Sequence, residues 1–198
     1  MAWYDLDQIR EDTSREWVKK TRYDELLSIS VDKLNNMINL DLREGEQYRI
    51  ITNNTYNAIS FIDFLLKHEQ IKQIYIAVYR LNQKSVTRII ELIERDGVEM
   101  NLLLSSFFRE NKKYEEWTRQ IETYARTTGR INLGFAVNHA KVFCAYTESK
   151  KYFVFEGSGN LSDNARIEQY LVENSKEMYN FHRKWISYYI KKYKDEVK

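Results

Sequence analysis

Apolar residues recur with two different periods along most of this chain, and the changes of period predict an alternation of strands and helices. Short apolar runs rich in β-branched residues predict strands at 48–52, 71–79 and 98–106. Segments with helical spacing follow them, at 58–68, 85–94 and about 111–126. Gly97 is placed to end the second of these helices. Such an alternation is typical of a parallel or mixed sheet covered by helices.

The pattern changes in the last third of the chain. Further strands are predicted at 131–137, 140–146 and 152–157. Only the polar residues 148–151 separate the last two, which is hairpin spacing and predicts an antiparallel pair. Apolar residues then follow a helical stripe from about 165 to 193, with a possible break near Asn174 or Asn180. We therefore predict an α/β fold in which helices flank a mixed sheet.

The first 44 residues differ from the rest, because their apolar positions fall at helical spacing without intervening strand patterns. We expect two or three helices in this N-terminal segment. Glu44-Gly45-Glu46 breaks the pattern. The sequence thus divides into an N-terminal helical segment, 1–44, and a main domain, 45–198.

Composition narrows the function only slightly. With 31 basic and 29 acidic residues in 198, the net charge of +2 neither indicates nor excludes nucleic-acid binding through a local basic face. The single cysteine, Cys144, rules out a disulfide framework and favours a reducing cytoplasm. No signal peptide or long apolar span is evident, so membrane insertion is not expected. Phosphate-loop, nucleophile-elbow and zinc-cluster motifs are missing, and no metal or cofactor is predicted.

One polar group stands out against the apolar strands. His139 and Lys141 are two residues apart in a strand and share one face. A four-residue loop would pair Thr147 with Tyr152, which places Lys141 opposite Ser158 and His139 opposite Asn160. A slip of one residue would undo this pairing.

Two readings of this group compete. A histidine in a strand is more often a hydrogen-bonded core residue than a catalyst, and a lysine can extend to solvent. However, lysine is rarely buried without a partner, and an anion such as phosphate would supply one. Gly157 and Gly159, on either side of Ser158, indicate close backbone approach at the strand end. We therefore favour a functional site.

The combination His139-Ala140-Lys141 and Gly157-Ser158-Gly159-Asn160 resembles the H-x-K and G-S-x-N signature of the phospholipase D superfamily. The resemblance implies one half of that fold and cleavage of a phosphodiester without a metal. It implies that His139 attacks phosphorus and forms a phosphohistidine, while Lys141, Ser158 and Asn160 hold the phosphoryl oxygens. Glu168, or failing that Glu173, would orient a catalytic imidazole, and a second histidine would protonate the leaving group.

This chain carries one such motif, whereas an active site of this type needs two. His68 and His182 are not followed by a lysine two residues on. The resemblance therefore implies a homodimer with the active site on its two-fold axis, where His139 meets its own copy. One position departs from the pattern: Tyr146 stands where the family usually has an aspartate. Because Tyr146 should face away from His139, we expect that aspartate to be structural.

For the substrate we favour DNA or RNA. The resemblance implies this, because lipid-acting members of the superfamily are usually long chains with two motifs, whereas short single-motif members are more often nucleases. Arg80 and Asn53, at predicted strand ends, are candidates to line the same cleft. Further basic residues could neutralise a nucleic-acid backbone, namely Arg109, Lys112, Lys113, Arg126, Arg130, Lys150, Lys151 and Arg166. The first alternative is a catalytically weak nucleic-acid-binding module. A lipid phosphodiesterase ranks last, since no basic amphipathic element indicates membrane docking.

Overall fold

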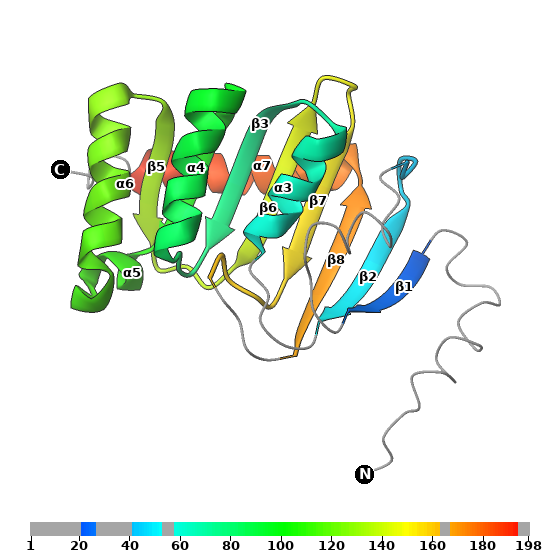
Figure 1. Ribbon diagram of the computed structural model, residues 1–198, viewed down its shortest axis with the longest axis horizontal. Helices are drawn as coiled ribbons and strands as arrows, with labels where there is room; N and C mark the ends of the chain where they lie inside the picture. Colours follow the sequence, from blue (N-terminus) through cyan, green and yellow to red (C-terminus); the bar gives the residue numbers. More distant parts are fainter. Residues whose placement is uncertain (1–20, 27–40, 53–57, 163–166, 194–198) are drawn as a thin grey trace, which may run out of the picture.

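The protein is built on one mixed sheet with helices against both faces, as a computed structural model shows (Figure 1). The structure describes residues 21–26, 41–52, 58–162 and 167–193. Within these ranges the sheet has eight strands in the order β1-β2-β8-β7-β6-β3-β4-β5. The strands are β1 Thr21–Leu26, β2 Gln47–Thr52, β3 Ile71–Val78, β4 Glu99–Ser105, β5 Ile131–Ala136, β6 Lys141–Thr147, β7 Tyr152–Gly157 and β8 Glu168–Asn174.

Parallel and antiparallel pairing divide this sheet into regions. Strands β3, β4 and β5 are parallel to one another, and β1 is parallel to β2. Between these two groups β8, β7 and β6 run antiparallel to their neighbours. The predicted α/β class and mixed sheet are therefore confirmed.

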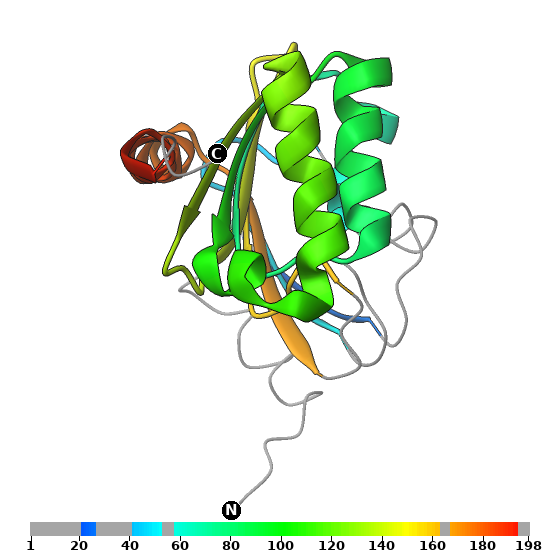
Figure 2. The same cartoon turned by 90° about the vertical axis from the view of Figure 1, so that its left-hand side faces the viewer.

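The helices form two layers, one on each face of the sheet, and one layer is larger than the other (Figure 2). They are α3 Ile59–His68, α4 Gln83–Asp96, α5 Ser106–Glu110, the 3-10 turn η1 Lys112–Tyr114, α6 Glu115–Thr128 and α7 Lys176–Tyr193. Helices α3, α4 and α6 pack over the larger core, whereas α7 is the one helix in the described ranges that crosses the opposite face. The predicted end of α4 at Gly97 is confirmed, with φ 66° at that residue. The helix begins two residues before the predicted Ser85, and Asn82 Oδ1 caps it by accepting from Ser85 N at 2.9 Å.

Two predicted helical regions prove to be strands. Residues 168–174 form β8 instead of the first part of a long C-terminal helix, and α7 begins only at Lys176. Tyr170 and Val172 are buried in the larger core, so the segment follows a period of two once it lies between β2 and β7. In the N-terminal segment, Thr21–Leu26 is the parallel strand β1. Residues 1–20 and 27–40 lie outside the described residues, so the rest of that prediction and the boundary at 44 remain untested.

The hairpin that carries the motif has a shorter loop than predicted. Thr147 N donates to Lys151 O at 3.2 Å, and Lys151 N donates to Thr147 Oγ1 at 3.1 Å, which leaves three residues in the loop. The last of them, Lys150, has a φ of 65°, as three-residue hairpin loops require. Tyr146 therefore pairs with Tyr152, one residue away from the predicted register.

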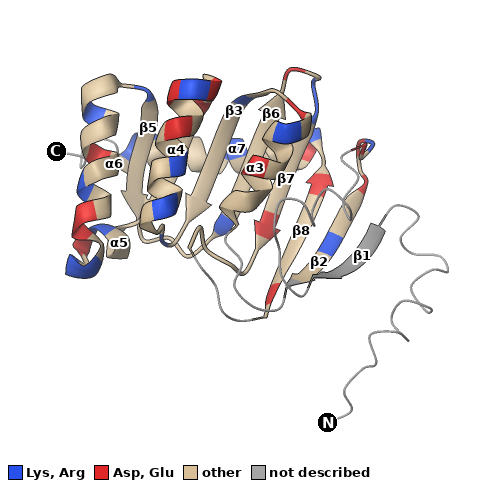
Figure 3. Cartoon of the chain, viewed as in Figure 1, with Lys and Arg blue, Asp and Glu red and all other residues tan. Residues whose placement is uncertain are grey.

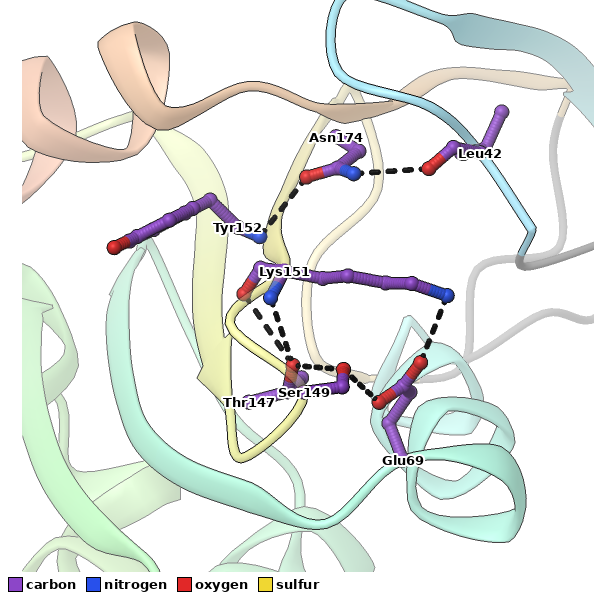
Figure 4. A network of polar contacts seen from close by, with 7 residues as sticks. All are labelled: Leu42, Glu69, Thr147, Ser149, Lys151, Tyr152 and Asn174. Carbon is purple, nitrogen blue, oxygen red and sulfur yellow. Dashed lines mark hydrogen bonds and ion pairs between the residues drawn. The ribbon is translucent and has the colours of Figure 1, made fainter.

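Polar side chains fix this loop to its surroundings (Figure 4). Ser149 Oγ donates to Glu69 at the end of α3, and Lys151 Nζ lies 3.0 Å from the same carboxylate. Buried Asn174 Nδ2 donates to Leu42 O at 2.9 Å, while its Oδ1 accepts from Tyr152 N at 3.0 Å. The register of β6 and β7 is thus set at the end opposite to His139.

Candidate active site

His139 lies in the loop between β5 and β6, at the edge where the parallel strands β3 and β4 end. Asn138 holds this loop in place. Its Nδ2 donates to Val78 O at 3.3 Å and Leu103 O at 3.4 Å, and its Oδ1 accepts from Ala140 N at 2.8 Å. The sequence prediction missed this positioning residue, because an asparagine beside a histidine has no distinctive spacing.

Lys141 and His139 are in direct contact. Lys141 Nζ lies 3.1 Å from His139 Nδ1 and donates to His139 O at 2.7 Å. The ring of Tyr79, just beyond β3, lies 4.9 Å from the imidazole between centroids, and Lys141 Nζ is 5.8 Å from the same ring. His139 is exposed and Lys141 is half-buried. The imidazole can therefore reach a substrate while the ammonium group stays beside it.

The second half of the motif reaches the same edge through β8. Ser158 N donates to Gln169 O at 3.0 Å, and Gln169 N donates back to Ser158 Oγ at 3.0 Å. Ser158 Oγ in turn donates to the carboxylate of Glu168, the first residue of β8. Glu168 therefore lies at the site, where it accepts a hydrogen bond from Ser158.

Electrostatics connect the two halves of the motif. Partial burial lowers the pKa of the Lys141 ammonium below its ordinary value. The negative charge of Glu168 raises this pKa, and the positive charge of Arg80 lowers it further. Two cations and one carboxylate thus act on one another at this edge. An incoming phosphate would neutralise the excess positive charge.

Arg80 is brought to the site by the segment that follows the motif. Leu161 forms an isolated parallel bridge with Leu81, and Asn82 N donates to Leu161 O at 3.1 Å. This bridge follows Arg80 on one segment and Asn160 on the other, and the charge of Arg80 acts on Lys141. Arg80 Nη1 donates weakly to Tyr114 Oη at 3.5 Å, whereas its Nε is buried without a partner among the described residues. Asn53 lies outside the described residues.

The observed register changes how the motif is assembled. With Val142 opposite Glu156, Lys141 is level with Gly157, so the predicted pairs of Lys141 with Ser158 and of His139 with Asn160 are wrong. Ser158 and half-buried Asn160 follow the last paired residue of β7. Gly157 is needed because an added Cβ would lie 2.1 Å from the Tyr170 ring and 2.8 Å from Gln169 O. Gly159 is buried.

Several of the basic residues proposed for nucleic acid lie away from the site or are paired with acids. Lys150 and Lys151 are in the hairpin loop at the opposite end of the strands. Arg109 pairs with Glu122 at 3.0 Å, and Arg130 pairs with Glu94 at 2.8 Å. Acids and bases are interspersed along α4 and α6 (Figure 3). Lys112 and Lys113 remain exposed near the site edge, beside α5, and Arg166 lies outside the described residues.

Tyr146 and Glu173 both lie away from the site. Tyr146 packs against Tyr152 and Tyr179 on the α7 face, at centroid distances of 4.9 and 6.4 Å, as expected for a residue facing away from His139. Glu173 lies near the far end of β8. No group of three or more histidine, cysteine or acidic side chains suited to a metal ion occurs in the described ranges. Nor is any described helix long and apolar enough to cross a membrane.

Comparison with solved structures identifies the fold. The chain is similar to Nuc from Salmonella typhimurium, a phospholipase D family member, with a TM-score of 0.53 and 12% identity over 73% of this chain and 94% of Nuc. The chain therefore has the phospholipase D fold.

Two larger proteins share the same architecture. Polyphosphate kinase from Porphyromonas gingivalis matches with a TM-score of 0.56 and 16% identity over 79% of this chain and 28% of the kinase. TrmBL2, an archaeal chromatin protein, matches with a TM-score of 0.51 and 14% identity over 95% of this chain and 62% of TrmBL2. No protein-family model and no curated protein sequence matches the chain.

Proposed function

We propose that this protein is a metal-independent phosphodiesterase, a nuclease acting on DNA or RNA through a covalent phosphohistidine. One observation carries the proposal: both halves of the motif meet at a single sheet edge. His139 and Lys141 are in contact, and Ser158 and Glu168 are in contact. The negative charge of Glu168 raises the pKa of Lys141, which links the two halves. Similarity to a phospholipase D family member supports this reading of the edge.

In the proposed reaction a neutral His139 nitrogen attacks phosphorus. The bond from phosphorus to the leaving oxygen breaks, and that oxygen takes a proton from a second histidine. Water then gives a proton back to the second histidine and attacks phosphorus. The phosphorus–nitrogen bond breaks, and its electron pair returns to His139. Lys141 and Arg80 stabilise the negative charge on the non-bridging oxygens, and Asn160 donates a hydrogen bond to them. Ser158 donates as well once its hydroxyl turns from Glu168 toward the phosphoryl group.

The second histidine is supplied by another copy of the chain. Of the other two histidines, His182 is a buried residue of α7 and His68 ends α3, away from this edge. A homodimer with its axis through the site would bring two copies of His139 together. Mixing tests this directly: wild type co-refolded with an equal amount of His139→Ala should lose about half of its activity per wild-type subunit. Independent single-chain sites would keep full activity.

The activity itself is tested by cleavage of labelled single- and double-stranded DNA and RNA in excess EDTA. Wild type should cut, and His139→Ala should lose at least about 10³-fold. His68→Ala, which changes an exposed histidine outside the site, should cut like wild type.

A second candidate is a DNA-binding module without catalysis, which the likeness to a chromatin protein over 95% of this chain favours. Under this alternative wild type and His139→Ala would bind DNA equally and neither would cut. Cleavage of phosphatidylcholine vesicles with no action on nucleic acid would instead indicate a lipid phosphodiesterase.

A further inference from the structure

An exposed aromatic ring lies beside the candidate nucleophile. Phe107, in α5, leaves 45% of its surface exposed and stacks on Tyr79 with a centroid distance of 5.3 Å and an interplanar angle of 15°. Tyr79 in turn lies 4.9 Å from the His139 ring. The rings of Phe107, Tyr79 and His139 therefore lie in series at this edge.

The core does not need Phe107. The next residue, Phe108, is fully buried and stacks on Tyr114 at 5.3 Å, so α5 is already anchored through Phe108. Exposing nearly half of a phenylalanine at this edge forfeits part of the burial free energy that an apolar side chain contributes. A ligand that covers the ring would recover that free energy.

We propose that Phe107, supported by Tyr79, is a stacking platform for the nucleobase next to the phosphate that His139 attacks. Phe107 and His139 each lie about 5 Å from Tyr79, so their centroids are no more than about 10 Å apart, within reach of a flanking nucleotide. Every base has a π-face, so this subsite selects nucleic acid over a lipid headgroup with little preference for sequence. This inference rests on the proposed nuclease function and specifies its substrate.

The platform also requires an unpaired base. A base inside a duplex is stacked on both sides by its neighbours and has no free face to offer. The substrate is therefore single-stranded nucleic acid, or a strand end or loop whose bases are unstacked.

The test compares two single strands of equal length and charge, one with bases and one made entirely of abasic tetrahydrofuran nucleotides. Phe107→Ala should lower kcat/KM on the base-bearing strand by roughly 5- to 150-fold, the value of one stacked base. It should leave cleavage of the abasic strand unchanged. Phe107→Trp should keep the preference for bases, and Phe181→Ala, which removes a 57% exposed ring from α7, should behave as wild type.

Two results would overturn the platform: equal cleavage of the base-bearing strand by Phe107→Ala and wild type, or an equal loss on both strands. Annealing a complementary strand should shrink the Phe107→Ala effect to less than about twofold, and an undiminished effect on duplex would refute the need for an unpaired base. Fluorescence anisotropy of the same two strands on His139→Ala, with and without Phe107→Ala, measures the platform without chemistry. If wild type cuts neither strand, the nuclease proposal fails, while this binding difference still decides the platform.

Discussion

Two histidines occupy opposite kinds of environment in this fold. His139 is exposed at a sheet edge, with Lys141 as its polar contact. His182, on α7, is only 3% exposed, and both of its ring nitrogens have partners. Trp185 Nε1 donates to its Nδ1 at 3.0 Å, so Nε2 carries the proton and lies 2.7 Å from Glu156 Oε1.

The two regions differ in how fully their polar side chains are paired with partners from the same chain. The two ring nitrogens of His182 lie against Trp185 and Glu156, and the hydrogen bond from His182 lowers the pKa of Glu156. At the site edge, partial burial lowers the pKa of Lys141, and Arg80 Nε lacks a partner among the described residues. Incomplete matching of half-buried cations weakens folding but leaves them available to an anion, so the edge is suited to binding and the α7 face to stability.

Among the variants that test this comparison, the largest effect should come from Lys141→Met, which removes the charge but keeps a side chain of similar length. Cleavage should fall by about 10²- to 10³-fold, as when one stabilising donor is lost from a transition state. Stability should stay equal or rise, because a partly desolvated ammonium no longer has to be buried. Initial rates and urea unfolding of the same preparation measure both. A large loss of stability would show instead that Lys141 stabilises the fold, as His182 does.

His182→Ala should give the reverse result. Removing one partner leaves the carboxylate of Glu156 without its hydrogen bond and opens a cavity under α7, at a cost of about 3 kcal/mol in the free energy of unfolding. The cleavage rate of the folded protein should not change. The control is His68→Ala at the exposed end of α3, which should shift stability by less than about 0.5 kcal/mol. A rate loss in stably folded His182→Ala would place this histidine in the chemistry and break the comparison.

The sequence allowed the site to be predicted better than the contacts within it. Period and turn residues were sufficient for β2 to β7 and for α3, α4 and α6, because their signals are local. Segment 168–174 was misassigned because Tyr170, Leu171 and Ile167 also fit a helical stripe, and only pairing with β2 and β7 selects the strand.

The site residues divide in the same way. His139, Lys141 and Ser158 could be found from the motif, whereas their register depended on Lys150 adopting a positive φ in the hairpin loop. Asn138 and Phe107 could not be predicted, because their contacts join segments that are distant in the sequence, such as Asn138 with Val78.

Glu168→Gln should have a smaller effect, a shift in the pH dependence of kcat/KM. Lys141 acts as a cation, so activity is present below its pKa and is lost as pH rises through it. Because that pKa is lowered from 10.5, the alkaline limb of kcat/KM should lie below pH 10.5. Glu168 raises the pKa, so removing its charge should move the limb to still lower pH. Glu173→Gln, near the other end of β8, is the matched control and should leave the limb in place. A shift to higher pH in Glu168→Gln would contradict the assigned coupling.

The smallest effect should be that of Glu156→Gln on the pH dependence of stability. The folded pKa of Glu156 is lowered, so its ionised form stabilises the protein above the ordinary value of 4.5 and this contribution is lost as pH falls through the folded pKa. Glu156 is 38% exposed in its side chain, so solvent screening should limit the contribution to about 1 kcal/mol or less. Urea midpoints should therefore favour wild type at pH 7, and the difference should shrink below pH 4.5. A difference that does not change with pH would mean that Glu156 contributes through packing. The contact between Glu156 and His182 would then not stabilise the fold through charge.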